Sequence, residues 1–252
     1  MSHLSKKEIN EYNEKGYLAP IDALTKDEAD EVREEIEFIE KKWPNELEGL
    51  GRNYVHLISP IFDKVVHNSK ILDAVESIIG KNILVAGTTL FIKDPDKKGF
   101  VSFHQDAKYI GFEPHNWVTA WLAITDSNEK NGCMRMWPGT HKNELKIHKE
   151  NFNYDQGNLL TRGQTIENVP INKTEPVILK AGQMSLHHPR IAHGSGINKS
   201  NKRRIGFVIQ SYIGTNVEQV IGKVYVQQAR GEDLFNFHEH ARRPLKTMEK
   251  ES

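Results

Sequence analysis

The chain has 252 residues, and its 34 lysines and arginines balance its 34 aspartates and glutamates, so its formal net charge is zero. That balance argues against a basic surface for nucleic acid. The single cysteine, Cys133, excludes a disulfide within the chain and argues against a thiolate metal site. The start, MSHLSKKEIN, lacks the apolar core of a signal peptide, and no apolar run approaches membrane-spanning length. We therefore expect a cytoplasmic globular protein, a monomer or homodimer, without nucleic-acid or membrane partners.

The first third of the sequence is predicted to be mostly helical. Ser5 with Glu8, and Thr25 with Glu28, each have the spacing of a capping box, which satisfies free amides at the start of a helix. After Thr25, apolar residues recur at steps of three and four positions, as one face of a helix requires: Ala29, Val32, Ile36 and Ile39. Pro44 ends this helix. A further helix is expected from about Ser69 to Gly80.

From Ile83 onwards the sequence is typical of short strands. Six segments are rich in β-branched and aromatic residues and are separated by turn signals such as DPDKKG and SNEKNG: ILVAGTTLFI, WVTAWLAI, CMRMW, PVILK, QMSLHH and RIGFVIQSYI. Many strands with few helices between them indicate an antiparallel sandwich or jelly roll. We expect one domain over residues 1–252, with a helical support at 1–80, a jelly-roll core at 81–230 and a lid insertion at 141–175.

The stretch FHQDAKYIG places His104 and Asp106 two residues apart in a strand-like setting. Side chains at i and i+2 of a strand point to the same face, so both groups face either solvent or the interior. A surface strand with two polar residues is one interpretation. A metal site is the other, because a buried carboxylate needs a compensating charge.

A second histidine cluster lies far downstream, in LHHPRIAHGSGINKSNKRRIG. It contains His187, His188 and His193, and Arg204 follows at the start of the next strand-like segment. Two histidines and one carboxylate leave three positions of a metal open, which suits non-haem Fe(II) with a chelating co-substrate and O2. An arginine at some distance supplies a two-pronged donor for the far carboxylate of 2-oxoglutarate.

Together these residues resemble the phytanoyl-CoA dioxygenase (PhyH) superfamily of Fe(II)/2-oxoglutarate-dependent oxygenases. The resemblance rests on His104-Gln105-Asp106, on NGCMRMWPGTH, on HGSG at His193 and on Arg204 eleven residues later. It extends over nearly the whole chain, including the opening NEKGYLAPIDALTKDEADEV. The resemblance implies a mainly β, cupin-like double-stranded β-helix with flanking N-terminal helices.

The same resemblance implies a role for individual residues. His104, Asp106 and His193 would bind iron, and Arg204 would pair with the carboxylate of 2-oxoglutarate. Ser195 would support that carboxylate, Thr89 and Trp121 would line the co-substrate pocket, and Gln105 would contribute to it. The halogenating branch of the superfamily has a small residue at the position of Asp106, so a carboxylate here favours hydroxylation, with conversion of 2-oxoglutarate and O2 to succinate and CO2.

The substrate is expected to be a small polar metabolite. The pieces NLLTRGQTIEN and ARGEDLFNF resemble the bacterial 2-aminoethylphosphonate hydroxylase group, so an aminophosphonate or a quaternary amine is the first candidate. A phosphonate needs a cation and an ammonium needs an aromatic face. Substrate-binding candidates are Lys108, Arg162, Tyr109, Asn53 and His56, with Trp137 as a second aromatic candidate beside Tyr109 and Arg135 as a weaker choice. For each of them, a solvated surface charge or an ordinary packed side chain is the other interpretation.

Several other interpretations remain open at this point. The protein could hydroxylate acyl-CoA esters or amino acids, hold a catalytic zinc ion, or be a non-catalytic cupin-like binding protein. Zinc hydrolases have no need of an arginine for a keto acid, so Arg204 argues against zinc. His187 and His188 are expected to pack or to hydrogen-bond behind the metal site, and His141 is expected to be a structural hydrogen-bonding residue.

Overall fold

The computed structural model describes residues 3–95, 98–150, 157–160 and 164–248. In these ranges four α-helices form: α1 (Lys6–Lys15), α2 (Lys26–Lys42), α3 (Pro60–Val66) and α4 (Ser69–Ile79). Both predicted capping boxes are confirmed, because Ser5 and Thr25 each exchange backbone and side-chain hydrogen bonds with the glutamate three residues on. The predicted ends of α2 and α4 are also confirmed, before Pro44 and at Gly80.

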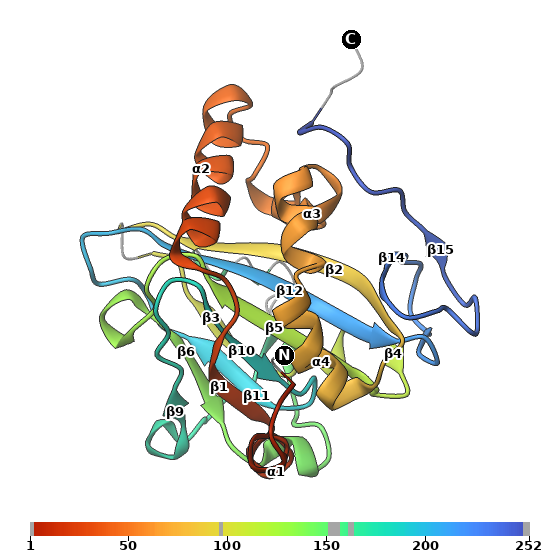
Figure 1. Ribbon diagram of the computed structural model, residues 1–252. Helices are drawn as coiled ribbons and strands as arrows, with labels where there is room; N and C mark the ends of the chain where they lie inside the picture. The colour runs from red at the N-terminus through yellow and green to blue at the C-terminus, as the bar shows by residue number, and fades with distance from the viewer. Residues whose placement is uncertain (1–2, 96–97, 151–156, 161–163, 249–252) are drawn as a thin grey trace.

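The large sheet has seven strands in the described portion of the chain, in the order β1-β10-β5-β12-β2-β14-β15. Figure 1 shows its long central strands, β12 and β2, running antiparallel beneath the helices. The strands are β1 (Tyr17–Asp22), β10 (Gln183–His187), β5 (Trp117–Ala123), β12 (Arg204–Gly214), β2 (Ile83–Lys93), β14 (Tyr225–Arg230) and β15 (Glu239–His240).

A smaller sheet of four described strands has the order β3-β11-β6-β9. These strands are β3 (Val101–His104), β11 (Ala192–Ser195), β6 (Met134–Trp137) and β9 (Glu175–Pro176). Two further pairs of short strands form separately. One joins β13 (Glu218–Gln219) to β4 (Phe112–Glu113), and the other joins β7 (Lys149–Glu150) to β8 (Gln164–Thr165). The expected mainly β, jelly-roll class with flanking helices is confirmed.

One predicted strand is wrong in detail. PVILK contributes only Pro176 to a strand, and after it only separate contacts continue, from Val177 N–H to the Met134 carbonyl and between Leu179 and Ser127. The segment still has one buried side, because Val177 and Leu179 are 3% and 2% exposed, while Ile178 between them is 55% exposed.

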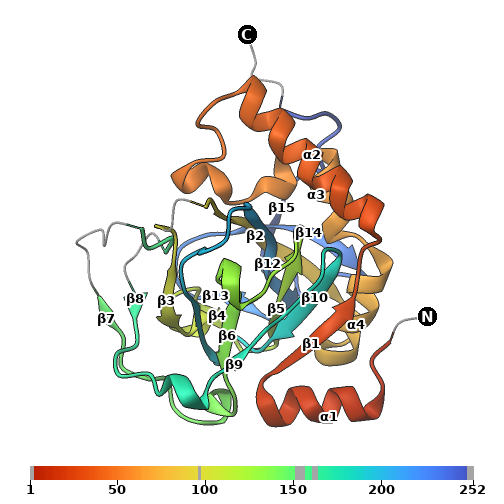
Figure 2. The same cartoon turned by 90° about the vertical axis from the view of Figure 1, so that its left-hand side faces the viewer.

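Alternation along the strands of the large sheet separates an outer core from an inner space. Val118, Ala120 and Leu122 of β5 pack with the apolar face of α2 and with α3 and α4. Trp121 and Ala123, on the opposite face of β5, pack instead with Met134 and Met136 of the small sheet. Figure 2 shows the helices covering one side of the large sheet while β3 and β6 lie on the other. Polar side chains on the inner face therefore lie between the two sheets, where a site can be enclosed.

No helix in the described ranges combines the length and the apolar composition that crossing a bilayer requires. Some of the predicted lid insertion at 141–175 lies outside the described residues. Two described residues of that segment, Leu160 and Gln164, line a cavity of about 580 Å³. The division into a support, a core and a lid stays a prediction.

Candidate metal centre and its cavity

His104 and His193 lie opposite each other on neighbouring strands. They are Cα partners in the antiparallel pairing of β3 with β11. Their rings are 4.2 Å apart between centroids, and each residue is 6% exposed. The pairing of two strands that are far apart in sequence thus brings together the two histidines that the sequence placed 89 positions apart.

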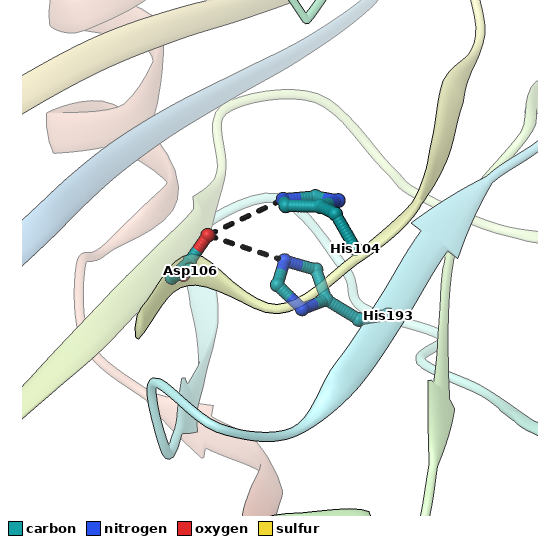
Figure 3. A group of neighbouring side chains, drawn as sticks. All are labelled: His104, Asp106 and His193. Carbon is teal, nitrogen blue, oxygen red and sulfur yellow. Dashed lines mark ion pairs between the residues drawn. The ribbon is translucent and has the colours of Figure 1, made fainter. Parts of the chain in front are cut away.

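Asp106 joins this pair from the turn that follows β3. The strand ends at His104, but Gln105 remains extended, with φ −125° and ψ 123°, so the side chains of residues 104 and 106 still point to the same side. Asp106 Oδ1 is 3.2 Å from His104 Nε2 and 3.9 Å from His193 Nε2 (Figure 3). One donor atom from each of the three residues lies within 4.8 Å of the other two.

The backbone fixes the orientation of both rings. His104 Nδ1 lies 2.9 Å from the Ser102 carbonyl oxygen, and His193 Nδ1 lies 3.1 Å from the Ile191 carbonyl oxygen. A carbonyl can only accept, so each Nδ1 carries a hydrogen, and each Nε2 is the nitrogen that faces Asp106. This arrangement is typical of histidine ligands, in which the second nitrogen holds the ring in place.

The charge states also suit a cation. Burial lowers the pKa of His193 to about 3, so its imidazole is neutral and free to coordinate at neutral pH. Burial alone would raise the pKa of Asp106, but the neighbouring His193, His104 and His187 hold it well below the usual value. The Thr119 hydroxyl lies 3.1 Å from Asp106 Oδ2 and 2.8 Å from the Gln210 carbonyl oxygen, either of which can accept its one hydrogen, and Oδ1 of Asp106 faces the two histidines.

A third imidazole lies at the same place. His187, at the end of β10, has its Nε2 3.5 Å from Asp106 Oδ2, and its ring is 4.7 Å from that of His193. It is 1% exposed and it lines the cavity. The sequence predicts that His187 lies behind the metal site. Its position beside Oδ2 of Asp106 agrees with that prediction.

These groups open onto a cavity of about 580 Å³ between the two sheets. Its polar lining includes Asn53, Tyr109 and Gln210, while Leu50 and Val224 are among the apolar residues. The sequence pointed to Asn53 and Tyr109 but not to the other three. Gln210 had one detectable signal, since it is the only amide in the apolar run RIGFVIQSYI of β12.

Arg204, Trp121 and Ser195 line the same cavity. Arg204 is 1% exposed, and its guanidinium carbon lies 5.2 Å from the centre of the Trp121 ring. Burial lowers the pKa of Arg204 to about 10, which keeps it charged at neutral pH. Gly206 permits this stacking, because a Cβ there would lie 2.3 Å from Cζ2 of Trp121.

Two predicted co-substrate residues do not line the cavity. Thr89 donates its hydroxyl to Asn53 Oδ1 at 2.7 Å and so acts behind a lining residue. Gln105 points away because it alternates with His104 and Asp106. It is fully buried, and its amide bonds the Arg190 carbonyl and the Lys146 N–H.

Two predicted substrate residues are also absent from the cavity lining. Lys108 is exposed on the turn after β3. His56 is 1% exposed and its Nδ1 bonds Thr88 Oγ1 at 2.8 Å on the far side of β2. Arg162 lies outside the described residues.

The weaker candidates are engaged elsewhere. Arg135 bonds Thr174 and pairs with Glu129, and the ring of Trp137 lies under the ammonium of Lys146; neither residue lines the cavity. His141 hydrogen-bonds the Asn13 carbonyl at 3.0 Å, which confirms it as a structural residue. The ring of His188 packs on that of His141, with centroids 5.2 Å apart.

Comparison with known proteins gives consistent relatives. The chain is 28% identical over 167 residues to a probable alpha-ketoglutarate-dependent hypophosphite dioxygenase of Stutzerimonas stutzeri, which covers 66% of this chain and 58% of that protein. It is 34% identical over 136 residues to the peroxisomal phytanoyl-CoA dioxygenase of Homo sapiens, over 52% of this chain and 40% of that one. The chain thus spans less than two thirds of the length of these curated relatives.

A solved structure matches more completely. The apo form of the non-heme monooxygenase ThoJ superposes with a TM-score of 0.82 and 30% identity, over 95% of this chain and 89% of that one. The model of the family described as phytanoyl-CoA dioxygenase (PhyH) matches residues 12–206. That range contains the histidine pair, Asp106 and Arg204, and the chain belongs to the phytanoyl-CoA dioxygenase family.

Proposed function

We propose that the protein is an Fe(II)- and 2-oxoglutarate-dependent dioxygenase that hydroxylates an aliphatic C–H bond of a small polar molecule. One observation carries the proposal: the donor atoms of His104, Asp106 and His193 converge at a cavity that also contains the buried guanidinium of Arg204. The three donor atoms suit a metal with open coordination positions, and the guanidinium suits the far carboxylate of a keto acid.

The residues present fit an iron ion. His104 and His193 would bind it through Nε2, and Asp106 through Oδ1, while Thr119 holds the other carboxylate oxygen. Two imidazoles and one carboxylate on a single face are the ligand set of non-haem Fe(II) oxygenases. The carboxylate at position 106 fills the place that a halide would need, so we propose hydroxylation and not halogenation.

The co-substrate would extend from this centre to Arg204. Ser195 and Trp121 lie beside that guanidinium in the same lining, and Trp121 covers one of its faces. Arginine offers two parallel N–H donors to a carboxylate, and a buried, uncompensated guanidinium gains most from such a partner. Among the described residues, no carboxylate pairs with Arg204.

Bound iron would supply the oxidising chemistry, in which substrate R–H, O2 and 2-oxoglutarate give R–OH, succinate and CO2. The chain's own residues bind, orient and exclude water. Apolar side chains such as Val101, Val208 and Met134 line the cavity together with the candidate ligands and keep the reacting region poor in water.

The finer proposal is an aminophosphonate, such as 2-aminoethylphosphonate, or a quaternary amine as substrate. The hypophosphite dioxygenase among the relatives supports a small phosphorus oxyanion. In the described lining, the lysines and arginines are Arg204, proposed for the co-substrate, and Lys223, which pairs with Glu239. A phosphonate would therefore depend on Arg162, which we propose lies at the mouth together with Tyr109 and Asn53.

Asn53, Gln210 and Gln164 also favour a neutral, hydrogen-bonding substrate of similar size. We propose in addition that the segment 141–175 covers the cavity mouth, since Leu160 and Gln164 reach the lining. A cytoplasmic location and a monomer or homodimer stay predictions.

Two experiments test the function. Under nitrogen, addition of Fe(II) and 2-oxoglutarate to the apoprotein should produce a weak charge-transfer band near roughly 500 nm, which a zinc site or an inactive cupin-like protein would not give. A succinate-release screen should then compare aminophosphonates, quaternary amines, amino acids, neutral amides and acyl-CoA esters. Absence of both the band and succinate would contradict the proposal.

A further inference from the structure

A second buried cation lies behind the end of the cavity that holds Arg204. Lys93, the last residue of β2, is the Cα partner of Arg204 in β12. It is 0% exposed, and the Asn198 side chain donates to its backbone carbonyl at 2.9 Å. Lys93 does not itself line the cavity.

The ammonium of Lys93 is held by oxygen atoms and not by a carboxylate. Its Nζ donates to Ser195 Oγ at 2.6 Å, to the Gly196 carbonyl at 2.5 Å and to the Gly132 carbonyl at 3.3 Å. Within the described ranges, neither Lys93 nor Arg204 makes an ion pair with a carboxylate. Two neighbouring basic side chains are therefore buried without a compensating anion, and charging both of them is costly unless a ligand provides one.

The electrostatics agree with that geometry. Burial, together with the nearby Arg204, lowers the pKa of Lys93 to about 6. The other titratable group that faces it is the Cys133 thiol, whose pKa is raised by burial, so the thiol remains neutral at neutral pH. An anion at this end of the cavity would favour the charged ammonium.

Ser195 connects Lys93 to the cavity. Its hydroxyl oxygen accepts from Lys93, so the hydroxyl hydrogen is available to donate in another direction. Ser195 lines the cavity, and Arg204 does so as well. Lys93 thus fixes the Ser195 hydroxyl, a neutral donor, beside the Arg204 guanidinium. When Lys93 is protonated, it also adds positive charge behind that guanidinium.

We propose that Lys93 is a positioning residue for the distal carboxylate of the co-substrate, acting through the Ser195 hydroxyl and through its own charge. The inference rests on the proposed function, since it assigns a role toward 2-oxoglutarate. It extends that function because it gives the carboxylate site three contributing residues: Arg204 and Ser195 touch the ligand, and Lys93 orders Ser195 without touching it.

A purely structural lysine is the rival interpretation, because Lys93 also joins two loops through the Gly132 and Gly196 carbonyls. The two roles predict different measurements. A structural lysine affects thermal stability and every ligand alike. A positioning lysine affects ligands that have a distal carboxylate, and its effect becomes smaller once Ser195 is removed, because the part transmitted by the hydroxyl is lost.

The test measures binding to the Ni(II)-loaded full chain by calorimetry, for wild type, K93M, K93Q, S195A and the double variant K93M/S195A. The two ligands are 2-oxoglutarate and 2-oxobutyrate, which keeps the keto acid but has no distal carboxylate. K93Q removes the charge but keeps a hydrogen-bond donor for the Gly132 and Gly196 carbonyls. It replaces K93M in the test if K93M does not fold. Thermal melts and Ni(II) affinity show that each variant is intact.

We expect the Kd for 2-oxoglutarate to rise about 10- to 100-fold in K93M and K93Q, since one charge-assisted interaction is lost. The Kd for 2-oxobutyrate should change less than about threefold, and K93M should raise the Kd for 2-oxoglutarate by a smaller factor in S195A than in wild type. An unchanged Kd for 2-oxoglutarate, an equal loss for both ligands, or full additivity with S195A would overturn the role of Lys93. Failure of wild type to bind 2-oxoglutarate would instead overturn the proposed function.

Discussion

His104 and His193 face each other across the pairing of β3 with β11, and each ring donates Nδ1–H to the carbonyl two residues before it. The same local contact on both strands directs both Nε2 atoms toward Asp106 Oδ1. The site is therefore ordered by the protein chain before any ion arrives, which keeps the entropy cost of metal binding low.

The first prediction concerns His193. His193→Ala removes one of the two imidazoles proposed as metal ligands, so we expect metal binding and succinate formation to be lost while the fold remains intact. Calorimetry with Ni(II), circular dichroism and a succinate assay measure the three properties. His240→Ala is the matched control, because that histidine is 40% exposed in its side chain and pairs with Asp233. Retained metal binding in H193A would point to His187 or His188 as the ligand.

The second prediction concerns Arg204. Arg204→Ala removes the guanidinium proposed for the co-substrate, and we expect the Kd for 2-oxoglutarate to rise about 100-fold or more, as for other buried charged pairs. Arg203→Ala is a close control, since the neighbouring guanidinium pairs with Glu40 and Asp94 and does not line the cavity. Equal affinities of R204A and R203A would place the carboxylate site elsewhere.

Local sequence patterns predicted most of the fold. Capping at Ser5 and Thr25 and the apolar spacing along α2 depend on residues within one or two turns, so they can be read without tertiary information. PVILK shows the limit: its composition indicates a strand, but whether a buried apolar segment joins a ladder depends on its neighbours in space.

The same limit applies to the site. The motifs around His104, Asp106 and His193 predicted that these three residues form one site. Alternation along the strand also predicted that Gln105, between His104 and Asp106, points away from it. Lys93 gave no such signal. Its position follows from sheet pairing, which sets Lys93 opposite Arg204. Nothing in the local sequence around Lys93 contains that information.

The third prediction concerns the support of the carboxylate ligand. Thr119→Val removes the hydroxyl that contacts both Asp106 Oδ2 and the Gln210 carbonyl, with little change in volume. Residues that orient a metal ligand in this way change metal affinity about 10- to 100-fold, so we expect Ni(II) binding to weaken by that factor. Thr247→Val is the matched control, because it removes a threonine–carboxylate hydrogen bond, to Glu35, away from the cavity. If T119V binds Ni(II) as tightly as T247V, Thr119 does not orient the ligand.

The last prediction concerns pH. Since the pKa of Lys93 is lowered to about 6, the free protein at pH 7 to 8 has mostly neutral Lys93, and an arriving carboxylate favours its protonation. Binding of 2-oxoglutarate should then take up a proton, and its Kd should rise with pH above 6, by at most about tenfold per pH unit. Below pH 6 the lysine is already charged, so this contribution to the Kd is constant there.

Calorimetry of the Ni(II)-saturated protein in two buffers with different ionisation enthalpies measures the proton uptake directly. The Arg204 guanidinium stays charged over this range, and the carboxylates of 2-oxoglutarate are already ionised, so neither contributes a slope. K93M should show no proton uptake at pH 7.5 and a flat profile of Kd against pH. The same slope in wild type and K93M would mean that another group takes up the proton, and Lys93 would then have no role in the pH dependence.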